Sequence, residues 1–193
     1  MKNFSKYILI FLIVPFVFSS CSKDDDNDSP PEPTNFYEAH NGVWVTSFSD
    51  GSQTLLDIYD NGWDSYYRTT NSGCWSIPAS LGGSTTITSN TPDELLAETI
   101  NIVASNVFTG DDLQILLDAG YPTVSISQAY LHTSSTLISF AMIFYAGIFE
   151  VELITISGNF GKQSSDSFSV CREMNNYNNY YKISEDALSI LNK

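Results

Sequence analysis

The feature that most constrains this fold is a series of short β-type runs separated by turn residues. Runs rich in β-branched and aromatic residues occupy positions 43–48, 55–59 and 65–70. Asp-Gly at 50–51 and Asp-Asn-Gly at 60–62 lie between them. This spacing is typical of neighbouring antiparallel strands joined by hairpins.

The same pattern continues along the chain and defines the expected fold class. Further strand-like runs lie at residues 74–77, 84–88, 99–103, 123–127, 136–156 and 167–171. The apolar run at 138–149 is shorter than the roughly 20 residues of a membrane span, so it predicts buried β-structure. Eight or more strands with little helix predict a mainly β fold, either an antiparallel β-barrel or a two-sheet sandwich.

Helix signals are few, and they predict one or two short helices. Thr91-Pro92-Asp93-Glu94 combines a hydroxyl cap, a proline and a later glutamate, which predicts a short helical turn before the strand at 99–103. Residues 111–120 begin with two aspartates, place leucines on one face and end in glycine, which predicts a short helix.

The first 20 residues have the three parts of a secretory signal. Lys2 and Lys6 precede an apolar run at 7–18, and two serines precede Cys21. The Phe18-Ser19-Ser20-Cys21 junction resembles the lipobox of bacterial lipoproteins. That resemblance implies cleavage before Cys21, acylation of Cys21 and a lipid anchor in a membrane. The alternative is an ordinary signal peptide in which Cys21 has no special role.

Residues 21–35 are expected to form a solvated tether, and residues 36–193 a single β-rich domain. Lys23 and an acidic run at 24–28 are followed by alternating prolines, a composition that cannot bury apolar surface. The start of this segment resembles the export signal of Bacteroidota-type surface lipoproteins, which implies an outer-membrane anchor facing the cell exterior. If the acidic run is only a soluble linker, the protein would face the periplasm.

Charge excludes one large class of partner. The chain has 8 Lys and Arg against 22 Asp and Glu, a formal charge of -14. Five of those basic residues and 17 of the acidic ones fall within 36–193, so the domain itself is acidic. Nucleic acid is therefore not an expected partner, and neutral ligands or divalent cations suit the surface better.

Apart from Cys21, the chain has two cysteines, Cys74 and Cys171. In an exported protein, two such cysteines most simply form one disulfide. Two independent buried thiols are the alternative.

Two Gly-x-Trp triplets, Gly42-Val43-Trp44 and Gly73-Cys74-Trp75, look like the strand starts of lipocalin-like lipoprotein domains. In that family the tryptophan closes one end of an up-and-down barrel. The resemblance implies a barrel that can hold a small apolar molecule.

The familiar hydrolase, zinc-protease and nucleotide-binding motifs are absent from the sequence, and we do not expect an enzyme. His40 and His132 have no metal-ligand partner at a suitable spacing, so both are expected to be plain surface or strand histidines. Glu150 and Glu152 could face a barrel lumen, although such alternation more often forms a solvated strand face.

Two weaker patterns identify candidate binding residues. Asp57, Asp60 and Asp64 surround a turn and could offer oxygens to calcium, with a simple hairpin turn as the alternative. Aromatic side chains could stack on the sugar rings of a neutral glycan, or could pack in the core instead. The candidates for glycan stacking are Trp63, Tyr66, Tyr67, Tyr177 and Tyr180.

These observations together predict a cell-surface lipoprotein whose domain binds a ligand without transforming it. The ligand classes are a neutral glycan or a small apolar molecule. The alternative is a structural or interaction subunit of an envelope assembly without a small ligand.

Overall fold

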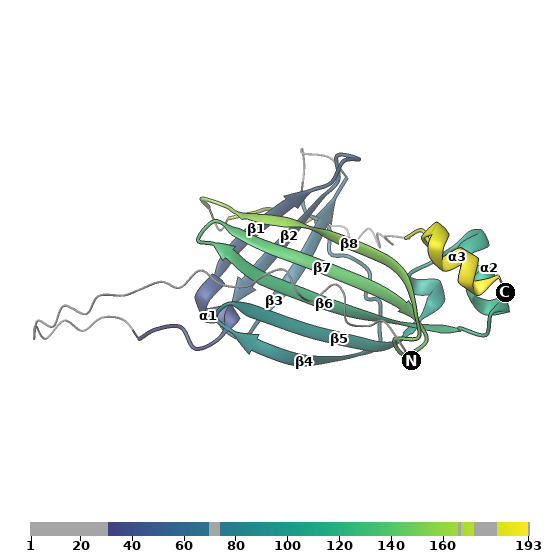
Figure 1. The fold of residues 1–193 in the computed structure, drawn as a ribbon. Coiled ribbons are helices and arrows are strands. Elements are labelled where there is room, and N and C mark those ends of the chain that lie inside the picture. Colours follow the sequence, from purple (N-terminus) through teal and green to yellow (C-terminus); the bar gives the residue numbers. More distant parts are fainter. Residues whose placement is uncertain (1–30, 70–73, 166, 172–180, 193) are drawn as a thin grey trace, which may run out of the picture. The chain divides into compact units, whose positions relative to one another are not determined.

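The structure, a computed structural model, describes residues 31–69, 74–165, 167–171 and 181–192 (Figure 1). The residues from Glu32 onward form a single folded unit. The predicted signal peptide, Cys21 and most of the predicted tether lie outside the described residues, so these interpretations stay predictions.

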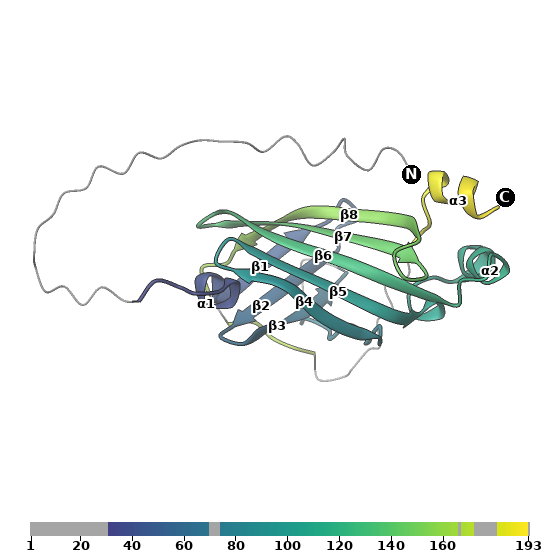
Figure 2. The same cartoon turned by 60° about the horizontal axis from the view of Figure 1, so that its bottom comes forward.

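A single eight-stranded antiparallel sheet dominates the fold, which confirms the mainly β prediction. The strand order is β3-β2-β1-β8-β7-β6-β5-β4, so each strand pairs with its neighbour in sequence except at the open seam between β3 and β4. The sheet curls into a half-barrel (Figures 1 and 2). The strands are β1 (Gly42–Ser47), β2 (Gln53–Tyr59), β3 (Gly62–Arg68), β4 (Ser84–Thr91), β5 (Glu94–Val103), β6 (Thr123–Ser134), β7 (Leu137–Ala146) and β8 (Val151–Lys162).

The first and last strands meet over a short length. Trp44 pairs with Lys162 and Val45 with Gly161, and the Gln163 backbone N–H donates to the Val43 carbonyl at 2.8 Å. Beyond this join, β1 to β3 turn away from β8 (Figure 1). The pairing of β1 with β8 is therefore confined to the first residues of β1 and the last residues of β8.

Helices lie at both ends of the curl. They are α1 (Phe36–His40), α2 (Gly110–Asp118) and α3 (Glu185–Leu191), with a 3-10 turn η1 (Ala104–Asn106) before α2. The prediction of a helix at 111–120 is confirmed, whereas α1 and α3 were not predicted. No helix among these residues has both the length and the apolar character of a membrane span.

The predicted helical turn at Thr91 is wrong. Thr91 pairs with Glu94 across the β4–β5 hairpin, and Pro92 and Asp93 form its two-residue turn. Residues 84–91 pair with residues 94–100 across this hairpin, with one irregularity between Ile87 and Ser89, so strand pairing overrides the local cap signal.

The segments at 74–77 and 167–171 were expected to be strands, but they form only isolated bridges, Tyr67 with Ser76 and Trp75 with Val170. A disulfide joins Cys74 to Cys171. Trp75 packs in a small cluster with Val43 and Leu55 on the outer face of β1 and β2. The disulfide therefore fastens two irregular segments over that outer face.

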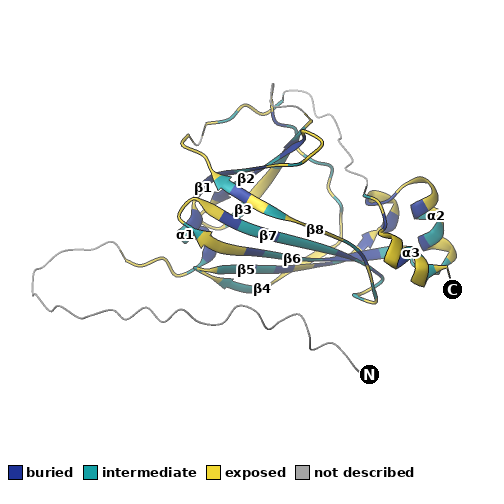
Figure 3. Ribbon diagram, turned by 45° about the horizontal axis from the view of Figure 1, so that its top comes forward, coloured by how far each residue is buried: buried dark blue, intermediate teal, exposed yellow. Residues whose placement is uncertain are grey.

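Two larger clusters of buried apolar side chains form the core. Figure 3 marks the buried residues in dark blue. One cluster lies beneath α1 and includes Phe36, Trp44, Leu56, Tyr130, Phe140 and Phe160. The other lies beneath η1, α2 and α3 and includes Ile102, Phe108, Leu116, Val124, Phe144 and Leu153. Met142 and Ile156 pack against both. Side chains thus occupy both ends of the interior.

Candidate functional site

Helix α1 bridges the open seam at one end of the sheet. The Phe36 backbone N–H donates to Asn90 Oδ1 on β4 at 2.9 Å, and the Tyr37 ring stacks on Trp63 of β3 with centroids 5.9 Å apart. Phe36 and Tyr37 are both buried. These contacts hold α1 between the two edge strands and fix the position of its last residue, His40.

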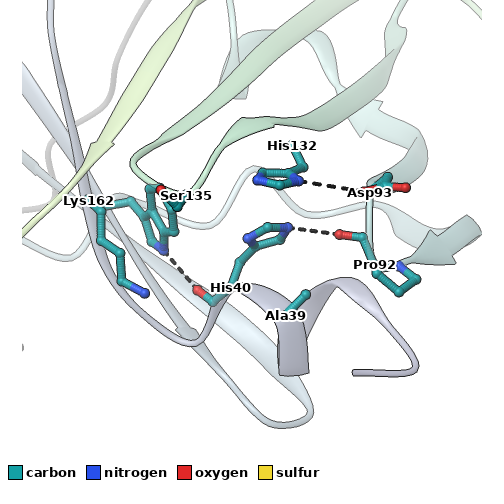
Figure 4. Close-up of a pocket in the computed structure, with 8 residues that line it drawn as sticks. Ala39, His40, Pro92, Asp93, His132, Ser135 and Lys162 are labelled. Carbon is teal, nitrogen blue, oxygen red and sulfur yellow. Dashed lines mark hydrogen bonds and ion pairs between the residues drawn. The ribbon is translucent and has the colours of Figure 1, made fainter. Parts of the chain in front are cut away.

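Two hydrogen bonds hold His40 in place (Figure 4). Its Nε2 lies 2.8 Å from the Pro92 carbonyl oxygen, and its own carbonyl accepts from Trp44 Nε1 at 2.8 Å. Because a carbonyl can only accept, Nε2 carries the proton and donates to Pro92.

Burial lowers the pKa of His40, and the nearby His132 and Lys162 lower it further, against an opposing effect of the Pro92 hydrogen bond. His40 is therefore a neutral imidazole near pH 7. Its Nδ1 lies on the side of the ring away from Pro92 (Figure 4).

The second histidine comes from the far end of β6. His132 Nδ1 lies 3.5 Å from Asp93 Oδ1, and the His132 ring centroid is 4.8 Å from that of His40. The His132 backbone N–H also donates to the Asp93 carbonyl at 2.8 Å. Two histidines that are far apart in sequence therefore meet at one end of the sheet.

Lys162, the last residue of β8, completes this group. Its Nζ lies 5.3 Å from the centroid of the Trp44 ring. His40, His132 and Lys162 are three of the five basic side chains in the described part of the chain, the other two being Arg68 and Lys182.

These three side chains surround a cavity of about 350 Å³, which we call the basic pocket. Its lining consists of Ala39, His40, Trp44, Pro92, Asp93, His132, Ser135 and Lys162 (Figure 4). The pocket offers an ammonium group, two imidazoles, one carboxylate at the rim and an apolar wall. It was missed from sequence because the residues come from α1, two hairpin turns and the ends of three strands.

Asp93, His132 and Ser135 are the three residue types of a hydrolytic triad. Within the described part of the chain, however, no hydrogen bond joins Ser135 to His132, and Asp93 lies 3.5 Å from His132. A triad needs both contacts at about 2.6–3.2 Å, and the described residues make neither of them at that distance.

The aromatic residues predicted to bind a glycan do not form one exposed surface. Trp63 is half-buried between Tyr37 and Tyr130, and Tyr67 is buried. Tyr66 packs on Phe168 with centroids 4.9 Å apart. Alternate residues of a strand point to opposite faces, so Tyr66 lies on the other side of the sheet from Trp63 and Tyr67. Tyr177 and Tyr180 lie outside the described residues.

The predicted calcium residues lie at the β2–β3 hairpin. Asp57 and Asp64 pair across the two strands, and Asp60 Oδ1 accepts from Asn41 Nδ2 at 2.9 Å. The described residues contain no group of three or more His, Cys, Asp or Glu side chains able to hold a metal ion.

A second cavity, of about 480 Å³, lies between β8 and α3 and has an acidic rim of Glu150, Glu152 and Asp186. Glu150 accepts from the Tyr121 hydroxyl at 3.3 Å, and Glu152 from the Thr155 hydroxyl at 2.7 Å. Both glutamates are exposed, so they lie outside the packed interior.

The basic pocket is thus the best-organised polar site in the described part of the chain. Its histidine rings and its tryptophan are held by backbone hydrogen bonds or ring contacts, and its lining combines charge with apolar surface. Comparison with protein-family models, with curated proteins and with solved structures finds no match to this chain.

Proposed function

We propose that this protein is a non-catalytic ligand-binding domain and that the basic pocket is its binding site. The observation that carries the proposal is a cavity of about 350 Å³ in which three of the five described basic side chains converge. That volume lies within the range of roughly 300–1,000 Å³ typical of small-molecule sites. Rigid anchoring of His40 keeps the cavity formed before a ligand arrives, which reduces the entropy lost on binding.

Of the two expected ligand classes, the geometry favours a small molecule with an apolar body over a neutral glycan. Ala39 and Pro92 give the pocket an apolar wall. A glycan site would need exposed aromatic faces on one surface, and Trp63, Tyr66 and Tyr67 are partly or fully buried on two faces. The ligand would bind at the mouth of the curl, because side chains fill its interior.

The cellular setting of this proposal rests on the sequence. The lipobox-like junction at Cys21 and the acidic segment after it support a lipid anchor in the outer membrane, with the domain on the outer surface. A tether over residues 21–35 would leave the pocket accessible to small solutes outside the cell.

The test is a cavity-filling substitution. Ala39→Phe adds a ring at the pocket wall and changes no charge, and Ala119→Phe makes the same change at the end of α2. Binding of benzoate, benzamide and benzylamine to the full-length protein in detergent is measured by saturation-transfer NMR. We expect wild type and Ala119→Phe to bind at least one probe and Ala39→Phe to lose it. Failure of all three probes with wild type, or unchanged binding by Ala39→Phe, would refute the proposal.

A further inference from the structure

The position of Lys162 shows which chemical group the ligand should carry. Lys162 is exposed, and it forms no ion pair with any residue that the structure describes. The other two described cations have partners: Lys182 lies 3.7 Å from Asp112, and Arg68 donates to Gln53 at 2.8 Å and stacks on Trp75. Within the described part of the chain, no carboxylate neutralises the Lys162 ammonium.

The Lys162 side chain also belongs to the pocket lining. Its Nζ sits over the Trp44 ring at 5.3 Å from the centroid, and Trp44 is itself fixed by its bond to the His40 carbonyl. Attraction to the aromatic face holds the charge beside the cavity without neutralising it. The ammonium is therefore available to a negatively charged group in the pocket.

His132 provides a second polar contact on the opposite wall. Asp93 faces its Nδ1 at 3.5 Å, so Nε2 is the nitrogen left to meet a ligand (Figure 4). Asp93 is 87% exposed at its side chain and stands at the rim, where water weakens its field.

His40 adds a flat, uncharged surface between these groups. Burial is the main cause of the lowered pKa of His40, and repulsion by His132 and Lys162 adds to it against the attraction of Asp93. The neutral ring and the adjacent Ala39 and Pro92 suit a planar or apolar body, while the Lys162 end suits an anion.

We propose that the basic pocket recognises a small organic monocarboxylate, with its carboxylate group on the Lys162 ammonium and its apolar body against Ala39 and Pro92. This inference rests on the proposed function and specifies the ligand class. The overall charge of -14 opposes polyanions at long range. The Debye length at physiological salt is about 8 Å. A single carboxylate in the pocket would lie closer than this to Lys162, so the nearby ammonium decides its electrostatic energy more than the overall charge does.

The test compares benzoate with its neutral isostere benzamide, and with benzylamine and inorganic phosphate. Affinities are measured by isothermal titration with full-length wild-type protein, Lys162→Met, Lys162→Arg and Lys182→Gln. Lys162→Met removes the charge and keeps the apolar stem, Lys162→Arg keeps the charge, and Lys182→Gln removes one charge elsewhere. Thermal unfolding of each variant checks its folding.

Wild type should bind benzoate about 5- to 10-fold more tightly than benzamide, as expected for one partly exposed charged contact. Lys162→Met should abolish this preference, whereas Lys162→Arg and Lys182→Gln should retain it. Phosphate bound as tightly as benzoate would overturn the carboxylate assignment in favour of a simple anion site. Equal affinity for benzoate and benzamide would refute the inference and leave the proposed function standing. No binding of any organic probe would refute both.

Discussion

The anchoring of α1 by Phe36 leads to a prediction with two separate readouts. Phe36 is 1% exposed and lies in the apolar cluster beneath α1. Truncation to alanine removes the ring and leaves a cavity, which costs about 3–5 kcal/mol of unfolding free energy. A five-residue helix has almost no stability of its own, so α1 should also lose its place across the seam.

When α1 loses its place, His40 should become mobile. The hydrogen bond from Trp44 Nε1 to the His40 carbonyl, 2.8 Å long in the native fold, should then break. Urea unfolding followed by tryptophan fluorescence measures the first effect. Hydrogen exchange of the Trp44 indole N–H measures the second, and it should accelerate in Phe36→Ala under native conditions.

Leu116→Ala is the matched control. Leu116 is a residue of α2 and is fully buried in the other cluster. Its truncation should lower the unfolding free energy by a similar amount, about 2–5 kcal/mol. Leu116 does not contact α1. In Leu116→Ala, exchange of the Trp44 indole N–H should therefore accelerate only as far as the loss of global stability requires. The reasoning is refuted if Phe36→Ala costs less than about 1 kcal/mol, or if both variants change indole exchange equally for the same loss of stability.

Three further predictions concern the disulfide, His40 and Cys21. Replacing Cys74 and Cys171 together by serine should lower the unfolding free energy by about 3–5 kcal/mol, because the bond closes a loop across a sequence separation of 97; an unchanged urea midpoint would contradict this. Since the pKa of His40 is lowered in the folded state, its contribution to stability is complete above its ordinary value near 6.5 and is lost as the pH falls below it. NMR titration should give His40 a lower midpoint in folded than in urea-unfolded protein, and equal midpoints would contradict the burial argument. Cys21→Ser should abolish incorporation of labelled palmitate in cells, and unchanged labelling would remove the lipoprotein interpretation.

The strands were predictable because their signals are local. The runs at 43–48, 55–59 and 123–127 fall within β1, β2 and β6 or overlap them by all but one residue. The first two hairpin turns lie where Gly or Asn follows Asp. The helix at 110–118 was recognisable for the same reason, since its acidic first turn and following Gly120 belong to the segment itself.

Helix α1 also carries a local signal, although a short one. The Asn35 side chain accepts from the Glu38 backbone N–H at 3.1 Å, and Glu38 accepts from Thr34, as in a capping box. An Asn-x-x-Glu pattern at the start of a helix of only five residues was too short a signal to separate the helix from the end of the tether. At Thr91 the same kind of pattern proved misleading, because Thr-Pro-Asp-Glu serves a hairpin turn equally well.

The basic pocket could not be predicted because it depends on contacts between distant segments. His132 reaches Asp93 only through the register of β5 with β6, in which Glu94 pairs with Leu131. Lys162 reaches Trp44 only because the last strand pairs with the first. Each of these residues on its own looks like an ordinary surface side chain.

A structure of the full-length protein with bound benzoate would test the central claim most directly. The account predicts the carboxylate within hydrogen-bonding distance of Lys162 Nζ and the ring against Ala39 and Pro92. Benzoate bound at any other surface, with the basic pocket unchanged and empty of it, would contradict the account.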